Sequence, residues 1–204
     1  MDSNAANHRW LHPSRTGALP LLTPVLHWTV GAGMLGMLAL GFYMHETKSY
    51  GLYSWHKSIG VTLLIVIIAR VVWRLRQGFP SPVGAHPLWQ QRLARATHWI
   101  LLAATLVMPL SGMLYSGLGG YGIKVFGVTL VPGQQDSNGK TLPFNDGLAE
   151  LFEGVHHYTA WLIVVVVSLH IAGALKHHFI DKDATLRRML GQAPSSTERV
   201  ESQR

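Results

Sequence analysis

The sequence predicts an all-α protein built as a transmembrane four-helix bundle, and three observations support this prediction. Charged residues make up only 13% of the chain and hydrophobic residues 48%, whereas charged residues are about 25% of an ordinary soluble domain. Four apolar blocks are each long enough to cross a bilayer, which takes about 20 helical residues. The Lys and Arg residues behind the +7 net charge cluster between these blocks. That distribution indicates membrane topology rather than a basic stripe that binds nucleic acid.

The four blocks set the expected membrane spans, at residues 21–44, 52–73, 96–118 and 148–176. Ionisable side chains inside membrane segments are costly, so the few present are expected to face the interior of the bundle. The segment 119–147 between the third and fourth blocks is rich in Gly and Pro and longer than an ordinary connector. We expect it to lie on the membrane surface or to cover a site, with Asp146 capping the fourth helix.

The chain therefore divides into a short N-terminal segment (1–20), a four-helix transmembrane domain (21–178) and a tail (179–204) whose end has a disordered composition. One side of the membrane receives most of the basic residues: Arg9, Arg15, Arg74, Arg76, Arg92, Arg95, Lys176, Lys182, Arg187 and Arg188. The other side has Lys48, Lys124 and Lys140, offset by Glu46, Asp136 and Asp146. This asymmetry predicts a multi-pass protein of the bacterial inner membrane with both termini in the cytoplasm.

Cysteine is absent from the chain, whereas histidine occurs 12 times. The absence of Cys excludes disulfides, Cys-type zinc sites and iron–sulfur clusters. It also excludes a covalently attached c-type haem, which needs a C-x-x-C-H motif. A bound metal would therefore depend on histidine, carboxylate or methionine.

The histidines of the fourth block give the strongest functional signal. His156 and His170 are 14 residues apart, so at about 100° per residue they share one helix face, separated along the axis by about 21 Å. His157 lies about 140° away from His170 around the same helix. His156 and His170 are therefore expected to face two sites at different depths of the bundle.

Each of these two sites has a second histidine at a matching depth. His27 and His170 lie at similar distances from the inner ends of the first and fourth spans, respectively. His56 lies near the outer start of the second span, as His156 does in the fourth. Two His/His pairs suit haem iron, which has two free axial positions, better than zinc, which usually takes four protein ligands. The alternative is that these histidines only hydrogen-bond neighbouring helices.

Two further residues are candidates for the inner site. Arg70 follows His56 by 14 residues, so it shares that helix face at the inner depth. It either pairs with a haem propionate or extends to the membrane interface. His98, near the inner start of the third span, either binds a quinone or a propionate or is an interfacial histidine.

Several stretches resemble the bacterial cytochrome b561 family. They are LHW around His27, WHKSIG around His56 with Arg70 after it, HWILLAATLVMPLSG in the third span, VFGVTLVP in the outer loop, VHHYTAWLIVVVVSLH in the fourth span and the tail LKHHFIDKDATLRRML. The resemblance covers residues 21–192. It implies two non-covalent b haems with His27, His56, His156 and His170 as ligands. It also implies electron exchange with the quinone pool, and some members resemble superoxide oxidases that pass the electron to ubiquinone.

The expected function is thus an oxidoreductase of the respiratory membrane whose partners are lipid, quinone, and superoxide or a redox protein. Lys48, Lys57 and Lys124 near the outer mouth would steer the superoxide anion, although Glu46, Glu150 and Glu153 stand nearby. One alternative is a haem-b membrane anchor that relays electrons for a peripheral dehydrogenase or hydrogenase. Another is a metal-ion transporter that uses the histidines as a relay.

Overall fold

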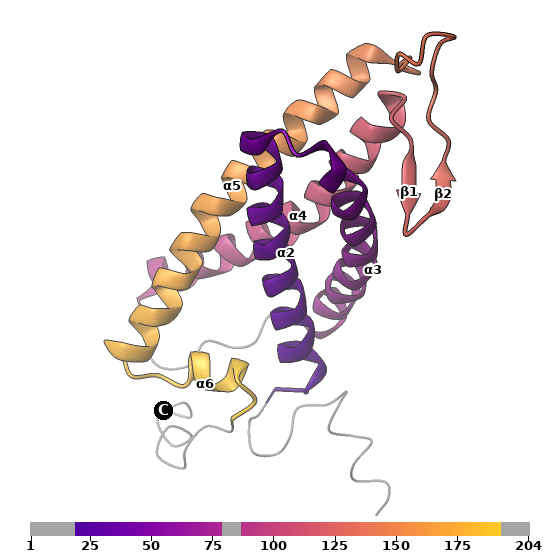
Figure 1. Cartoon of the computed structure of the whole chain (residues 1–204). Helices are drawn as coiled ribbons and strands as arrows, with labels where there is room; N and C mark the ends of the chain where they lie inside the picture. Colours follow the sequence, from indigo (N-terminus) through magenta and orange to yellow (C-terminus); the bar gives the residue numbers. More distant parts are fainter. Residues whose placement is uncertain (1–18, 79–86, 193–204) are drawn as a thin grey trace, which may run out of the picture. The chain divides into compact units, whose positions relative to one another are not determined.

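A computed structural model describes residues 19–78 and 87–192 of the chain (Figure 1). In chain order its elements are α2 (Leu22–Thr47), the short 3-10 helix η1 (Tyr50–Leu52), α3 (Tyr53–Gln77), α4 (Leu88–Leu118), β1 (Ile123–Val125), β2 (Val128–Val131), α5 (Asp146–Phe179) and α6 (Thr185–Met189). Four helices are long and apolar enough to cross a membrane: Leu22–Thr47, Tyr50–Gln77, Leu88–Leu118 and Asp146–Phe179. The prediction of an all-α fold with four spans is confirmed, and the only strands among the described residues form one small hairpin.

The helices extend beyond the apolar blocks that predicted them. α4 begins at Leu88, eight residues before the expected start of its span, and the carbonyl of Pro87 accepts hydrogen bonds from the first turn. The added segment is rich in Leu, Gln, Arg and Ala, which favour helix without being apolar. α2 likewise continues to Thr47, which brings His45 into its last turn instead of leaving it outside the helix.

The predicted cap of α5 was wrong by one residue. Asp146 is the first helical residue, and the side chain of Asn145 caps the helix, its Oδ1 accepting a 3.0 Å hydrogen bond from the Leu148 N–H. Asn is among the residues most favoured at this position. Asp146 then contributes a negative charge to the first turn, where it interacts favourably with the helix dipole.

The described chain divides into two compact units, and each long helix contributes one stretch to each unit. Of the described residues, unit 1 comprises 19–29, 69–78, 87–100 and 166–192; unit 2 comprises Val30–Ile68 and Leu101–Val165. Residues 1–18, 79–86 and 193–204 lie outside the described part, and with them the expected disordered end of the tail.

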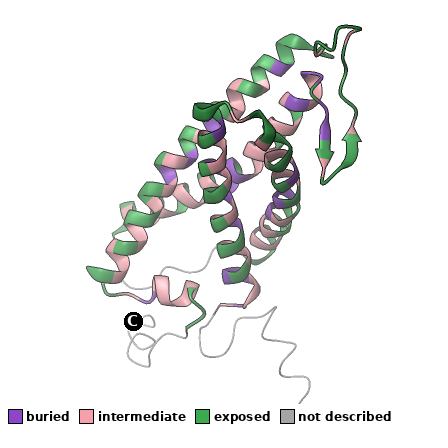
Figure 2. Cartoon of the chain, viewed as in Figure 1, coloured by how far each residue is buried: buried purple, intermediate pink, exposed green. Residues whose placement is uncertain are grey.

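Unit 2 is packed around fully buried Val30 and Ile67. Gly33 lets α2 approach α3 closely, since a Cβ at this position would lie 2.8 Å from Leu63 Cδ1. Small residues allow such close approach in membrane helix pairs. Many other apolar residues of the long helices are exposed, and Trp161 and Val165 of α5 are more than half exposed. Figure 2 colours the exposed residues green along the ribbon. Such surfaces suit helices that face lipid.

Unit 1 includes the described part of the tail, which folds back onto the start of α2. The Trp28 indole N–H donates a 2.8 Å hydrogen bond to the Met189 carbonyl at the end of α6. Lys176 at the end of α5 forms an ion pair with Asp181 at 2.7 Å, and the Nδ1 of His177 lies 2.9 Å from the same carboxylate. In the same unit Trp73 of α3 donates to the Thr23 hydroxyl of α2 at 2.9 Å.

Candidate functional site

The first candidate site lies in unit 2, where α3 and α5 bring His56 and His156 together. Their ring centres are 6.3 Å apart and their planes make an angle of 79°. Both side chains are partly buried. The α4 backbone also approaches this site, at Met108 and Gly112.

The surroundings of His156 favour one tautomer of its ring. Nδ1 lies 2.8 Å from the Met108 carbonyl oxygen and 3.3 Å from the Ser111 hydroxyl. A carbonyl only accepts, so Nδ1 carries the proton and donates it, which leaves the Nε2 lone pair free. Metal-binding histidines are commonly held in this way, with the second ring nitrogen donating to a backbone carbonyl.

The imidazole of His56 is oriented less tightly than that of His156. Its Nδ1 is buried and has no hydrogen-bond partner within the described part of the chain. A Cβ at Gly41 of α2 would lie 3.5 Å from its Cε1, which is ordinary contact. Buried polar groups are rarely left without a partner, so this atom is consistent with a site that receives a further polar group.

The second candidate site lies in unit 1, where three histidines meet. The rings of His27 on α2 and His170 on α5 have centres 6.1 Å apart. His98 on α4 lies closer to His170, with ring centres 5.1 Å apart, and its Nδ1 lies 2.6 Å from the Ala94 carbonyl of its own helix. The structure thus brings together His27 and His170, as their depths predicted, with His98 beside them.

The two ring separations fit a metal held between two imidazoles. An imidazole nitrogen binds a first-row metal ion at about 2.0–2.1 Å, so imidazoles on opposite sides of one ion have ring centres about 6 Å apart. The His27–His170 and His56–His156 pairs match this value, whereas the 5.1 Å of His98–His170 is too short. No group of three or more His, Cys, Asp or Glu that could hold a metal occurs among residues 19–78 and 87–192. Two imidazoles suit a metal that brings its other ligands, as haem iron does.

Arg70 reaches the second site directly. Its Nη2 lies 3.1 Å from His27 Nδ1, with the pair partly buried, so the side chain points to His27. A guanidinium only donates, so in this contact Nδ1 accepts and Nε2 carries the proton. Iron coordination through Nε2 needs the opposite tautomer, so it requires Arg70 to donate to another acceptor, such as a carboxylate.

The sequence reasoning missed a third histidine pair. His45 and His157, on α2 and α5 within unit 2, have ring centres 6.3 Å apart, but both side chains are exposed. The signal was hidden because the apolar block that marked the first span ended before His45. Separation alone does not identify a cofactor site, and partial burial is what distinguishes the two candidate sites from this pair.

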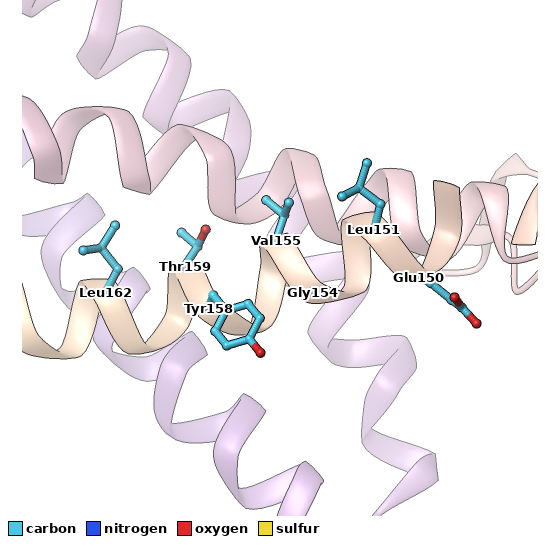
Figure 3. A pocket seen from close by; sticks show the side chains of 7 residues that line it. All are labelled: Glu150, Leu151, Gly154, Val155, Tyr158, Thr159 and Leu162. Carbon is cyan, nitrogen blue, oxygen red and sulfur yellow. The ribbon is translucent and has the colours of Figure 1, made fainter. Parts of the chain in front are cut away.

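A different face of α5 from the one that carries His156 has an open groove of about 690 Å³. It is lined by Glu150, Leu151, Gly154, Val155, Tyr158, Thr159 and Leu162. Figure 3 shows Leu151, Val155 and Leu162 along one side of the helix, whereas Glu150 and Tyr158 project from the other. The groove is mostly apolar with few polar groups, which suits the tail of a lipid-like molecule.

Gly112 offers a direct test of the His156 environment. A Cβ at this position would lie 2.8 Å from His156 Cε1 and 3.0 Å from its Nδ1. We expect Gly112→Ala to displace the imidazole and weaken cofactor binding at this site about 10-fold, the lower end of the range for groups around a metal ligand. Gly117→Ala on the same helix is the control, since a Cβ there meets nothing within 4 Å. Equal haem retention during dilution would show that His156 is not a ligand.

The comparisons with known proteins agree with one another. A family model described as prokaryotic cytochrome b561 matches residues 18–192. The chain is 36% identical over 188 residues to cytochrome b561 homolog 2 of Escherichia coli K12, covering 90% of this chain and 95% of that protein. It is 26% identical over 170 residues to cytochrome b561 homolog 1 of the same organism, covering 81% and 92%. It is 27% identical over 135 residues to the probable superoxide oxidase CybB of Yersinia pestis, covering 66% and 72%.

Proposed function

Because the chain belongs to the prokaryotic cytochrome b561 family of membrane haem proteins, we propose that it is a di-haem b cytochrome that oxidises superoxide and passes the electrons to ubiquinone. The observation that carries the proposal is the presence of two partly buried imidazole pairs, at 6.3 and 6.1 Å, one in each unit. Membership of the family supports haem as the cofactor, and the two pairs support two haems.

In this proposal His56 and His156 hold one iron, and His27 and His170 hold the other. Haem b, when bound, supplies an iron that carries one electron at a time. The Met108 carbonyl keeps the proton of His156 on Nδ1, so that Nε2 is available as the ligand. Arg70 turns from His27 to a haem propionate, which a guanidinium binds through two parallel hydrogen bonds. His98 donates through Nδ1 to the Ala94 carbonyl, which leaves Nε2 to accept a hydrogen bond from the hydroxyl of a quinol. Contact with a quinone carbonyl or a propionate requires a second proton on this ring, because both groups only accept.

The substrate part of the proposal has separate support. The similarity to a probable superoxide oxidase makes superoxide the first candidate donor. Of the three lysines expected to steer this anion, Lys57 donates to the Gly122 carbonyl at 3.0 Å. Lys48 and Lys124 are exposed and would carry the steering. The apolar groove on the Leu151–Leu162 face of α5 is proposed to take the quinone tail.

We also propose the cellular location and the membrane orientation of the protein from the distribution of its basic residues. The basic residues at the C-terminal end of α3, Arg74 and Arg76, and those in the tail favour an inner-membrane protein with both termini in the cytoplasm. This orientation would put the His56–His156 pair towards the periplasm. Superoxide formed there would then reach the site without crossing the bilayer.

The test is superoxide-dependent quinone reduction by the protein purified from membranes. We expect pulses of superoxide to reduce a soluble ubiquinone analogue only when the haem-loaded protein is present. Gly154→Leu, which fills the groove, is expected to raise the KM for quinone several-fold and to leave the haem spectrum unchanged. A haem-containing protein that reduces no quinone unless another protein is added would refute the oxidase proposal and support the anchor-subunit alternative.

A further inference from the structure

The β1–β2 hairpin has a tip that the local backbone does not favour. Val125 pairs with Val128, so Phe126 and Gly127 form a two-residue turn, and both have positive φ, 47° and 91°. Turns of this kind prefer Asn-Gly because a residue with a Cβ is strained in the left-handed region. A bulky aromatic residue at such a φ indicates that its side chain is needed at the tip.

The hairpin is firmly attached to the start of α3 in the same unit. The buried Ser58 hydroxyl accepts a 3.0 Å hydrogen bond from the Phe126 N–H and donates to the Ser54 carbonyl at 2.7 Å. The Gly122 carbonyl accepts from both Lys57, at 3.0 Å, and Ser116, at 2.7 Å. A two-stranded hairpin is marginal by itself, so these bonds fix its position on the helix.

One face of the hairpin is nevertheless left uncovered. Val128 and Leu130 lie two residues apart on β2 and therefore share a face; they are 65% and 54% exposed. Phe126 at the tip is 60% exposed, whereas Ile123 on the first strand is buried. Exposed apolar side chains grouped in this way mark a surface that contacts something other than water.

The apolar surface continues onto the lipid-facing side of α3. The ring of Phe126 packs edge-on against Trp55, with centres 6.2 Å apart, and Trp55 is 58% exposed. Ile59, one turn further along this membrane-spanning helix, is also exposed. Tryptophan is enriched at the boundary between lipid and water. This continuity identifies the bilayer as the occupant of the hairpin face.

We propose that the β1–β2 hairpin is a lipid anchor, which places the Phe126 ring, Val128 and Leu130 in the boundary between headgroups and acyl chains. Lys57 and Ser58, which hold the hairpin, directly follow His56. The anchor therefore fixes the start of α3 relative to the bilayer. The inference does not depend on the identity of the cofactor or substrate.

Cysteine labelling tests this proposal cleanly, because the chain has no cysteine of its own. Three single-cysteine variants are compared, each in phosphatidylcholine nanodiscs and each treated with a membrane-impermeant maleimide. They are Val128→Cys, Leu130→Cys and Thr129→Cys. Thr129 is exposed but faces away from Val128 and Leu130. We expect positions 128 and 130 to react about 10-fold more slowly than position 129, as burial in the interface implies. Equal rates at the three positions would overturn the proposal. Equal rates are also the result expected if the face binds a protein partner instead of lipid.

A second variant separates anchoring from folding. Phe126→Asn creates the Asn-Gly pair that this turn prefers, so the hairpin is expected to remain folded without its apolar tip. Combined with Val128→Cys, it should raise the labelling rate towards that of position 129, while the Soret band stays unchanged. Slow labelling that persists without the Phe126 ring would show that the tip does not anchor the hairpin. Leu130→Cys provides the same test if Val128→Cys proves unstable.

Discussion

Replacing His156 with alanine is expected to lower the haem content from about two to about one haem b per chain, since iron loses one of its two axial ligands. Superoxide-dependent quinone reduction should fall by more than about 100-fold, beyond the 10–100-fold typical of groups that only support a ligand. The pyridine haemochrome assay on membrane-purified protein measures the first quantity, and stopped-flow absorption the second.

His157 provides a matched control for this experiment. It is the next residue on α5, and its ring centre lies 6.3 Å from that of His45, but both side chains are exposed. His157→Ala should therefore keep both haems and nearly all activity. If His157→Ala loses a haem and His156→Ala does not, the ligand assignment in unit 2 is wrong. His56→Ala is expected to reproduce the loss seen in His156→Ala.

The second large effect is expected in unit 1, where His27 and His98 both approach His170. His27→Ala should remove the haem of this site, because only the His27–His170 separation of 6.1 Å leaves room for iron between the rings. His98→Ala should retain about two haems per chain. It is expected to alter quinone reduction instead, through the loss of its ring Nε2.

Haem counting and low-temperature spectra of the reduced protein distinguish the two variants. The opposite pattern, with haem lost in His98→Ala and kept in His27→Ala, would make His98 the axial ligand. Loss of both haems in His27→Ala would indicate unfolding. In that case His27→Gln, which keeps a polar side chain at this position, repeats the test.

The sequence was sufficient for the four spans because membrane helices need a long apolar run, and that run is visible without a structure. It was insufficient for their ends. Helix formation continues into polar turns that hydropathy does not register. α4 therefore began earlier than expected, in an Arg- and Gln-rich turn, and α2 ended later, after His45, Glu46 and Thr47. The hairpin was missed because β1 and β2 have only three and four residues. Strands this short give no clear alternating pattern.

For the candidate sites, helix periodicity placed His156 and His170 on one face and matched their partners by depth. The ring separations agree with that pairing, and the role of the four histidines as haem ligands remains a prediction. Contacts that depend on the backbone of another helix could not be predicted, such as the Met108 carbonyl at His156. The contact between Arg70 and His27 was also missed, because the guanidinium had been expected at a propionate or at the interface.

The position of Arg70 also has an energetic consequence for the proposed cytochrome. A guanidinium that pairs with a propionate of the haem held by His27 and His170 would offset that negative charge and stabilise an added electron on this iron. Arg70 would therefore raise the reduction potential of the haem beside His27. A higher potential at this haem would favour electron transfer towards it, and Arg70 would influence the direction of transfer without contacting the electron donor.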